Sequence, residues 1–386
     1  MTPAGQSLGE FLATLPECQD KRSLTHGLHP YPAKFIPHIP RRLIELFSRP
    51  GDTVLDPMCG SGTAVVEATV AGRIGLGADL NPIACLVSRA KTTLLSERDE
   101  RELAVLHRRL EVLGQVAAAP AEAAELAARV VLPDFKNRDH WFDFHISVEL
   151  SACLAEIERM ASCRARTVAR CAFSAVIVAV SRQESETRWA ARSVSAEPGA
   201  ATRRLATRIS EAVPRLRAYA AAAAVPTALI LQSDARRLPL QPGSVDLVVT
   251  SPPYANSHDY YLYNKLRMFW LGHDVIPVQE AEFGSRNKHS DLKMGVEHYL
   301  RSMQSVFAEI HRVLRVNGVA AVVVGDAVIR GDFFDMAEVL VPVASAAGLS
   351  LVDSQAFPHK RFTSAFNARF GTHRDKQTHV IVLRRA

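Results

Sequence analysis

The stretch GDTVLDPMCGSGTAVVEATVAGRIGLGAD, residues 51–79, constrains the fold of this chain more than any other. Its apolar residues at 53–56 are typical of a short buried strand, and those at 63–71 favour a helix that follows a glycine turn. A second strand is expected at 74–78, and Asn-Pro then predicts the cap and first turn of a helix over 81–91. Strand, turn, helix and strand in this order open a doubly wound α/β sheet.

The alternation of strands and helices is interrupted between residues 97 and 219, where the pattern is helical apart from two expected loops, 132–145 and 181–200. Strands resume at 227–231 and 245–250. The remaining elements are expected as helices 258–271, 295–315 and 333–347, a polar mobile loop 274–295, and strands 319–324, 349–357 and 377–383. We therefore expect three parts, namely residues 1–92 with the first half of an α/β core, a largely helical insertion at 93–225, and residues 226–386 with the second half.

The charge of the chain is unevenly distributed, although its net value is only +6. Residues 159–217 hold twelve Arg against four Glu, and residues 355–386 hold seven basic residues against one Asp, so the remainder is acidic. Two basic islands on an otherwise acidic protein indicate a polyanionic partner that touches defined surfaces. The alternative is that these cations lie on solvated helix faces without a partner.

Composition excludes several classes of protein. No apolar run reaches 18 residues, and the first twenty residues lack the basic and apolar regions of a signal peptide. We therefore expect a cytoplasmic protein that is neither secreted nor membrane-spanning. The six cysteines form no CxxC pair and have no histidines clustered near them, so reduced thiols are expected and no metal site.

A glycine turn and three carboxylates mark a ligand site at the strand ends. In DPMCGSGT, Gly60 and Gly62 allow the backbone to approach a ligand closely, but no Lys follows as in a nucleotide-binding P-loop. Asp56, Asp79 and Asp234 each follow a strand of the expected sheet. One such carboxylate suits a cation, the second a ribose diol, and the third an exocyclic amine. S-adenosylmethionine, with its ammonium, sulfonium, ribose and adenine, fits this set.

The strand at 245–250 ends in Ser251, Pro252, Pro253 and Tyr254, an unusually rigid corner. Both prolines fix φ and lack an N–H, so the carbonyls of Ser251 and Pro252 point in set directions. Together with the serine hydroxyl they can accept hydrogen bonds from an amino group. The tyrosine, expected to be exposed, offers a face on which a planar base can stack. A Pro-Pro turn that only ends the strand is the alternative.

DPMCGSGT and TSPPY together resemble the amino-methyltransferases of DNA, a family with a Rossmann-like fold and S-adenosylmethionine as cofactor. The resemblance covers roughly 26–90 and 227–386, and HGLHPYPAKFIPHIPRRLI at 26–44 is similar to the segment that helps to close over the methionine end of the cofactor. It implies a class I methyltransferase sheet with a largely helical insertion and an antiparallel C-terminal strand pair. The form with Ser first is most typical of cytosine-N4 enzymes, although adenine-N6 enzymes with Ser first exist.

The resemblance implies roles for individual residues. The cofactor would be bound by Tyr31, Pro32, Ala33, Lys34, Asp56, Pro57, Cys59, Gly60, Ser61, Gly62, Thr63, Asp79, Leu80, Asn81, Asp234 and Ala235. Catalysis would fall to Ser251, Pro252, Pro253 and Tyr254. Hydrogen bonds from the target amine to this corner would free its lone pair for direct attack on the methyl group. The chain has no Pro-Cys dipeptide, which a cytosine-C5 enzyme requires, and a target base in duplex DNA would have to be flipped out.

Basic residues in two expected loops are candidates for DNA contact. They are Arg182 and Arg188 in SRQESETRW, and Lys360, Arg361, Arg369 and Arg374, which are interleaved with phenylalanines before the last strand. They could equally be solvated cations or members of an internal polar network. Enzymes with the cofactor motif first read their target between the two motifs, but here Asp234 follows the insertion, so its role as a target-recognition region stays open.

For the whole protein, the resemblance implies a site-specific methyltransferase that acts on double-stranded DNA in a bacterial or archaeal cytoplasm or nucleoid, in restriction-modification or epigenetic marking. A homodimer and a cognate restriction endonuclease are expected partners, whereas a membrane is not. The alternatives are an adenine-N6 DNA enzyme, an RNA or protein-amide methyltransferase, and a non-catalytic scaffold that binds the cofactor.

Overall fold

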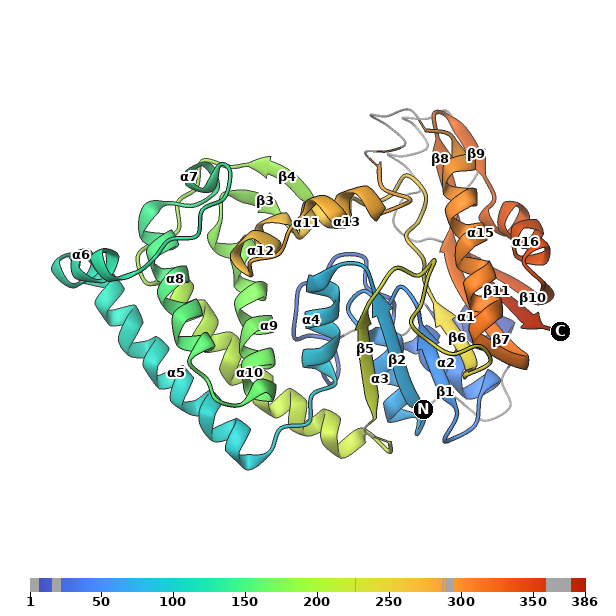
Figure 1. Ribbon diagram of the computed structural model, residues 1–386, viewed down its shortest axis with the longest axis horizontal. Helices are drawn as coiled ribbons and strands as arrows, with labels where there is room; N and C mark the ends of the chain where they lie inside the picture. Colours follow the sequence, from blue (N-terminus) through green and yellow to red (C-terminus); the bar gives the residue numbers. More distant parts are fainter. Residues whose placement is uncertain (1–6, 16–21, 226, 287, 289–293, 359–375) are drawn as a thin grey trace.

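The computed structural model describes residues 7–15, 22–225, 227–286, 288, 294–358 and 376–386. They form an α/β core and a helical insertion, which lie at opposite ends of the long axis in Figure 1. Among these residues, no helix is long and apolar enough to cross a membrane.

The core is built on a sheet of seven strands in the order β10-β11-β7-β6-β1-β2-β5. Their bounds are β1 Thr53–Asp56, β2 Ile74–Asp79, β5 Ala228–Gln232, β6 Val245–Thr250, β7 Leu314–Gly325, β10 Leu349–Pro358 and β11 Gln377–Arg385. Six strands run in one direction, while β11 lies antiparallel between β7 and β10. The expected class I sheet with its antiparallel C-terminal pair is confirmed. Its strand order reverses between β1 and β6, where such sheets bind ligands.

Burial on both faces explains why the central strands are apolar without alternation. In β7, Ala320, Val322 and Val324 pack on one face of the sheet, while Ala321 and Val323 pack on the other. The first face is covered by α15 (Val296–Val313) and α16 (Met336–Ala346), and the second by α1 (Leu8–Thr14), α2 (His38–Phe47) and α3 (Thr63–Val70). A strand covered by helices on both faces has to be hydrophobic throughout.

The insertion has its own hydrophobic core, in which Leu150 and Phe173 are fully buried. Its elements are α5 (Glu97–Ala118), α6 (Pro120–Arg129), α7 (Arg138–Trp141), α8 (Phe144–Glu158), α9 (Cys163–Val180), β3 (Gln183–Ser185), β4 (Arg188–Ala191) and α10 (Ala200–Ala222). Trp270 of α12 (Lys265–Trp270) is buried in the same core, and α9 packs on α4 (Pro82–Lys91). The insertion is therefore joined to the α/β core by side-chain packing as well as by the chain.

Short elements form within segments that were expected to be loops or a single helix. The expected loop 181–200 contains the β3–β4 hairpin, and the expected loop 132–145 contains α7. The expected mobile loop 274–295 contains α13 (Ile276–Ala281), which has a proline in its first turn. The predicted helix 258–271 is divided into α11 (Tyr260–Tyr263) and α12 at Asn264. The side-chain amide of Asn264 donates to the carbonyl of Tyr260 at 3.0 Å, a local contact that competes with regular helix.

The segment 333–347 was also expected to be one helix. Instead β9 (Asp332–Phe334) pairs with β8 (Ala327–Ile329), and α16 begins only after Asp335. The Asp335 carboxylate accepts from the backbone N–H groups of the next turn at 2.9 and 3.1 Å, which makes it the N-cap of the helix.

Candidate functional site

A cavity opens at the carboxyl ends of β1, β2, β5 and β6. Its empty volume is about 890 Å³, which includes the space at its open mouth. Most residues expected in the cofactor and catalytic sets line it, namely Tyr31, Ala33, Lys34, Asp56, Pro57, Cys59, Gly60, Ser61, Thr63, Asp79, Leu80, Asn81, Asp234, Ala235, Ser251 and Pro253. The expected residues that do not line it are Pro32, Gly62, Pro252 and Tyr254. We call the strand-end lining residues, within 56–63, 79–81, 234–235 and 251–253, the floor. The remaining lining residues, within 31–35, 260 and 278–283, are the cover.

The glycine turn after β1 belongs to the floor and is supported by α4. Gly60 and Gly62 have φ angles of +49° and +73°. The Gly60 N–H donates to Asp79 Oδ2 at 2.8 Å, and Ser88 Oγ on α4 donates to the Gly60 carbonyl at 2.9 Å. A Cβ at Gly62 would lie only 2.7 Å from Ser88 Oγ. Gly62 therefore allows the turn to approach α4 closely, instead of lining the cavity.

Two carboxyl groups of the floor, the buried Asp56 and the half-buried Asp79, have no cationic partner among the described residues. Asp56 accepts a hydrogen bond from Thr250 Oγ1 at 2.7 Å. Asp79 accepts from the backbone N–H groups of Gly60 and Asn81, both at 2.8 Å. Burial outweighs these hydrogen bonds and raises the pKa of Asp56 to about 7 and that of Asp79 to about 6. A cationic ligand in the cavity would favour the ionised form of both.

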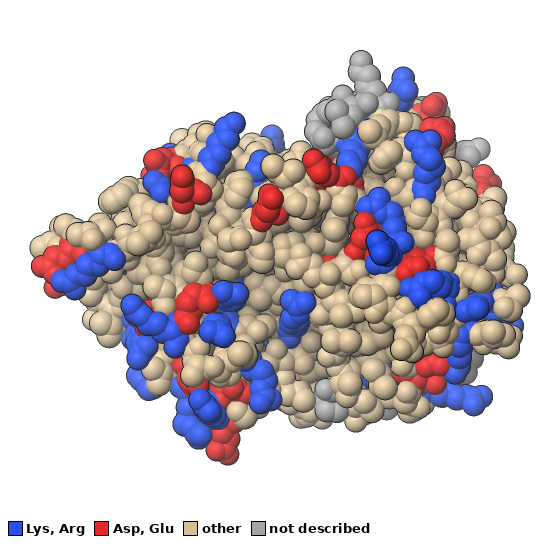
Figure 2. Space-filling model, viewed as in Figure 1, with Lys and Arg blue, Asp and Glu red and all other residues tan. Residues whose placement is uncertain are grey.

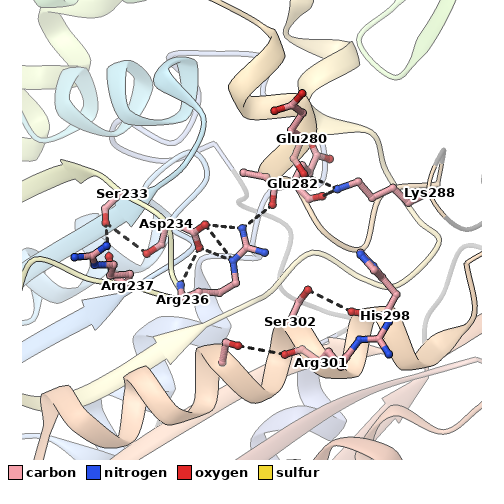
Figure 3. A network of polar contacts seen from close by, with 12 residues as sticks. Ser233, Asp234, Arg236, Arg237, Glu280, Glu282, Lys288, His298, Arg301 and Ser302 are labelled. Carbon is pink, nitrogen blue, oxygen red and sulfur yellow. Dashed lines mark hydrogen bonds and ion pairs between the residues drawn. The ribbon is translucent and has the colours of Figure 1, made fainter.

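The third carboxylate, Asp234, is already engaged by Arg236, so it does not stand open to an amine as we expected. Arg236 donates through Nε to Oδ1 at 2.9 Å and through Nη2 to Oδ2 at 2.5 Å. Burial alone would raise the pKa of Asp234, but the hydrogen bonds from Arg236 outweigh it and lower the pKa. Nη2 of Arg236 also donates to the Ala281 carbonyl at 2.9 Å, and the guanidinium lies 5.7 Å from the ring centre of Phe283. Figure 3 shows how Arg236 ties the floor to the cover.

The cover comes from segments that are far apart in the sequence. Tyr31 stacks on Tyr260, with ring centres 6.4 Å apart and planes 18° from parallel. The Lys34 ammonium donates to the carbonyls of His26 and His29 at 3.1 and 2.9 Å. Lys34 therefore braces the N-terminal segment, while the aromatic pair closes part of the cavity wall against water.

The corner after β6 presents Ser251 and Pro253 to the cavity, but the Tyr254 ring is half-buried against the sheet. A Cβ at Gly325 would lie only 2.7 Å from Tyr254 Cε2, so the ring occupies the space that this glycine leaves free. Burial raises the pKa of the Tyr254 hydroxyl, and a hydrogen bond with the Ser251 side chain partly offsets the rise. The sequence predicted an exposed tyrosine, and this prediction is wrong. The ring packs at Gly325, which lies 71 residues further along the chain on another strand.

The family model of DNA methylases matches residues 3–89 and 245–376, more than half of the chain. The chain belongs to the DNA methylase family. Type II methyltransferase M.MvaI of Kocuria varians is 27% identical over 271 residues, 65% of this chain and 58% of that protein. Type II methyltransferase M.MjaII of Methanocaldococcus jannaschii is 34% identical over 73 residues, 19% of this chain and 14% of that protein. The chain thus spans less than two thirds of the length of either relative.

Solved structures of methyltransferases resemble the chain only weakly. TrmN from Thermus thermophilus is 13% identical with a TM-score of 0.34, and the match covers 91% of this chain and 49% of that one. A TehB-like SAM-dependent methyltransferase from Corynebacterium glutamicum is 12% identical with a TM-score of 0.32, covering 90% and 87%. Likeness at this level adds nothing to the family match.

Membership of the DNA methylase family makes S-adenosylmethionine the cofactor, and the floor of the cavity fits it. The carboxyls of Asp56 and Asp79 lack cationic partners within the described part of the chain, and the ammonium and sulfonium of this cofactor would supply the missing charge. Gly60 lines the same floor without a side chain that would fill it.

In a DNA methylase the arginines of the insertion are candidate DNA contacts, but most of them are already paired. Ion pairs within the insertion and its surroundings include Arg159–Glu156, Arg164–Asp99, Arg170–Glu158, Arg182–Asp143, Arg188–Glu184, Arg208–Glu211 and Arg217–Glu100. On the face shown in Figure 2, basic and acidic side chains are accordingly interspersed. Arg182, which bonds Asp143, fits the internal polar network, whereas Arg188 is exposed. The other candidates, Lys360, Arg361, Arg369 and Arg374, lie outside the described residues.

One group of side chains within the described residues has the composition of a metal site. Ligand atoms of Asp326, Asp335 and His379 all lie within 4.8 Å of one another. His379 Nε2 bonds Asp326 Oδ1 at 2.7 Å, and Asp335 is occupied as the N-cap of α16. These contacts account for all three side chains without an ion, and none of the three lines the cavity.

Sequence reasoning missed seven residues that line the cavity, namely Phe35, Met58, Tyr260, Val278, Ala281, Glu282 and Phe283. Phe35 directly follows the predicted residues 31–34, and Met58 lies within DPMCGSGT between the predicted Pro57 and Cys59, so both were within reach of the sequence. Tyr260 is the first of two tyrosines shortly after the corner, a weak signal. The stretch 278–283 gave no signal, because its polar composition is that of any loop.

Proposed function

We propose that this chain is a site-specific DNA methyltransferase that methylates the exocyclic N4 amine of a flipped cytosine. The observation that carries the proposal is one cavity lined both by the residues expected to bind the cofactor, within 56–63, 79–81 and 234–235, and by Ser251 and Pro253 of the corner. The relatives named Type II methyltransferases support a restriction-modification role on double-stranded DNA, with a cognate restriction endonuclease as partner. A homodimer remains an expectation from the resemblance.

In the proposed reaction each part of the cavity has a task. The cofactor supplies a methyl group on a positively charged sulfur. Asp56 and Asp79 hold its cationic and ribose groups, because desolvated carboxyls without cationic partners gain most from such contacts. The Ser251 hydroxyl and a backbone carbonyl of the corner accept the amine hydrogens, which frees the nitrogen lone pair from the ring. Tyr31 and Tyr260 keep water out, and no side chain needs to bond covalently to the base.

The identity of the methylated nucleoside tests the proposal directly. The protein is incubated with tritiated S-adenosylmethionine and duplex DNA of mixed sequence, and the labelled nucleoside is identified after digestion. We expect N4-methylcytosine, because a corner with Ser first is most typical of cytosine-N4 enzymes. Label in N6-methyladenine alone would show that the protein is an adenine-N6 methyltransferase. Label that appears only when RNA is the substrate would contradict both DNA assignments.

Replacing Ser251 tests the role of the corner. We expect Ser251→Ala to lower kcat about 100-fold, the loss seen when one preorganised hydrogen-bonding group is removed from an active site. Cofactor affinity, measured by calorimetry, should change less than twofold because Asp56, Gly60 and Asp79 are unchanged. Ser257→Ala, six residues further along the same segment and absent from the cavity lining, is the matched control and should keep full activity. Equal losses of turnover and cofactor binding in Ser251→Ala would mean that the corner is only structural.

A further inference from the structure

Glu282 is a buried carboxyl of the cover that the proposed reaction leaves without a task. It follows α13 and lines the cavity together with Ser251 and Pro253. Two residues later the backbone packs on the corner, since a Cβ at Gly284 would lie 3.2 Å from the Pro253 carbonyl oxygen. The segment of Glu282 and the corner of Ser251 thus meet at one end of the cavity.

The surroundings of the Glu282 carboxyl are well defined. Its side chain receives hydrogen bonds from the backbone N–H groups of Tyr260 (to Oε1) and Tyr261 (to Oε2), both at 2.8 Å. Lys288, drawn beside it in Figure 3, donates to the backbone carbonyls of Glu280 and Glu282 and not to the carboxyl. Glu282 therefore has no ion-pair partner within the described part of the chain.

Desolvation decides the protonation state of this carboxyl. Burial outweighs the two hydrogen bonds from the backbone and raises the pKa of Glu282 to about 8. The titratable groups that face it are Tyr31, Asp259, Tyr260, Tyr263 and Lys288. Below about pH 8 the carboxyl holds a proton and is a hydrogen-bond donor as well as an acceptor.

The corner itself offers the base no free donor. Pro252 and Pro253 have no N–H and the carbonyls only accept, while the Ser251 hydroxyl is hydrogen-bonded with Tyr254. Beside its exocyclic amine, however, a flipped cytosine or adenine presents a ring nitrogen that only accepts hydrogen bonds. A base whose amine is held by Ser251 therefore needs a donor next to that site, because a buried acceptor left unpaired is destabilising.

We propose that the Glu282 carboxyl donates a hydrogen bond to the ring nitrogen beside the target amine and so holds this amine toward Ser251. The proposal rests on the proposed function, because it requires a nucleobase in the cavity. It makes Glu282 a residue that recognises the amine-bearing edge of the base, N3 and N4 of cytosine or N1 and N6 of adenine.

The pH dependence of methylation separates this role from a structural one. At saturating cofactor, wild-type kcat/KM for duplex DNA should fall about tenfold per pH unit above pH 8, as the carboxyl loses its proton. In Glu282→Gln the amide N–H donates at every pH, so the fall should disappear while activity at pH 7 stays within about tenfold of wild type. The matched control is Glu280→Gln, an exposed residue two positions earlier, which should keep the wild-type profile.

A substrate analogue tests the same contact on the wild-type protein. A duplex in which 3-deazacytosine replaces the target base carries a C–H in place of N3, and its slower methylation should show no fall above pH 8. An unchanged fall in Glu282→Gln, or on the analogue, overturns the proposal. If the wild-type protein methylates no DNA, the proposed function fails and this proposal fails with it. If the protein methylates DNA but its rate does not fall above pH 8, only the role proposed for Glu282 is contradicted.

Discussion

The floor and the cover of the cavity are built in different ways. The floor is built around strand ends, as Asp56 ends β1, Asp79 ends β2 and Ser251 follows β6. The cover depends on single contacts between distant segments, such as the hydrogen bond from Arg236 to the carbonyl of Ala281. Side chains fixed by a sheet stay in place without a ligand, whereas a segment held by few contacts opens at a lower free energy. We therefore expect the floor to be rigid and the cover to yield first.

The largest effect is expected from a substitution behind the floor. In Gly62→Ala the new Cβ would lie 2.7–3.0 Å from Oγ, Cβ and Cα of Ser88, at a φ of +73° that disfavours any side chain. Overpacking and the left-handed backbone together should lower the free energy of unfolding by roughly 2–5 kcal/mol, measured by urea unfolding. Gly243→Ala is the control, because Gly243 has φ of +65° but open space around it, and should cost about 1 kcal/mol. Equal costs for the two variants would mean that the approach of the turn to α4 does not constrain the floor.

A smaller effect is expected from the charge of the floor. Since the pKa of Asp56 is raised to about 7, this carboxyl is mostly protonated below that pH, and a cationic ligand then has to displace the proton. The affinity for S-adenosylmethionine should therefore rise with pH and level off above about 7, with a slope of up to tenfold per pH unit below it.

Calorimetry between pH 5.5 and 8.5 measures this slope, and Asp56→Asn should bind more weakly at pH 8 with a flatter profile. Asp52→Asn, at the opposite end of β1, is the control and should keep the wild-type slope. An Asp56→Asn variant that binds as tightly as wild type at pH 8 would show that this carboxyl does not face the cationic groups.

Much of the floor could be predicted from the sequence because its residues stand at fixed distances from strand ends. Gly60, Asp79 and Ser251 needed only the pattern of strand, turn and helix and the rule that parallel strands meet ligands at their carboxyl ends. The exception, Asp234, shows the limit of this reasoning. Its partner Arg236 is two residues away and visible in the sequence, but whether the pair forms depends on the turn between them.

The part of the cover at 278–283 could not be predicted, in contrast to the part at 31–34, because nothing local specifies it. Glu282 and Phe283 lie in a polar stretch, and they reach the cavity only because α13 folds back over the strand ends. The Tyr254 ring was misplaced for a similar reason, since the space it fills is created by Gly325 on another strand. In both cases a contact between distant segments, which the local sequence does not reveal, decides where the side chain lies.

The smallest effect is expected where floor and cover are joined. Arg236→Met removes the bond to the Ala281 carbonyl and the ion pair with Asp234, which is about one-third exposed, so the free energy of unfolding should fall by only about 1 kcal/mol. The cover should nevertheless open more often, and hydrogen exchange at residues 278–283 should become several-fold faster while β1 and β6 stay protected. The control is Arg237→Met, the exposed neighbour, with no change at either place. Equal acceleration in the cover and in the strands would contradict the distinction between the two, because both would then open as one unit.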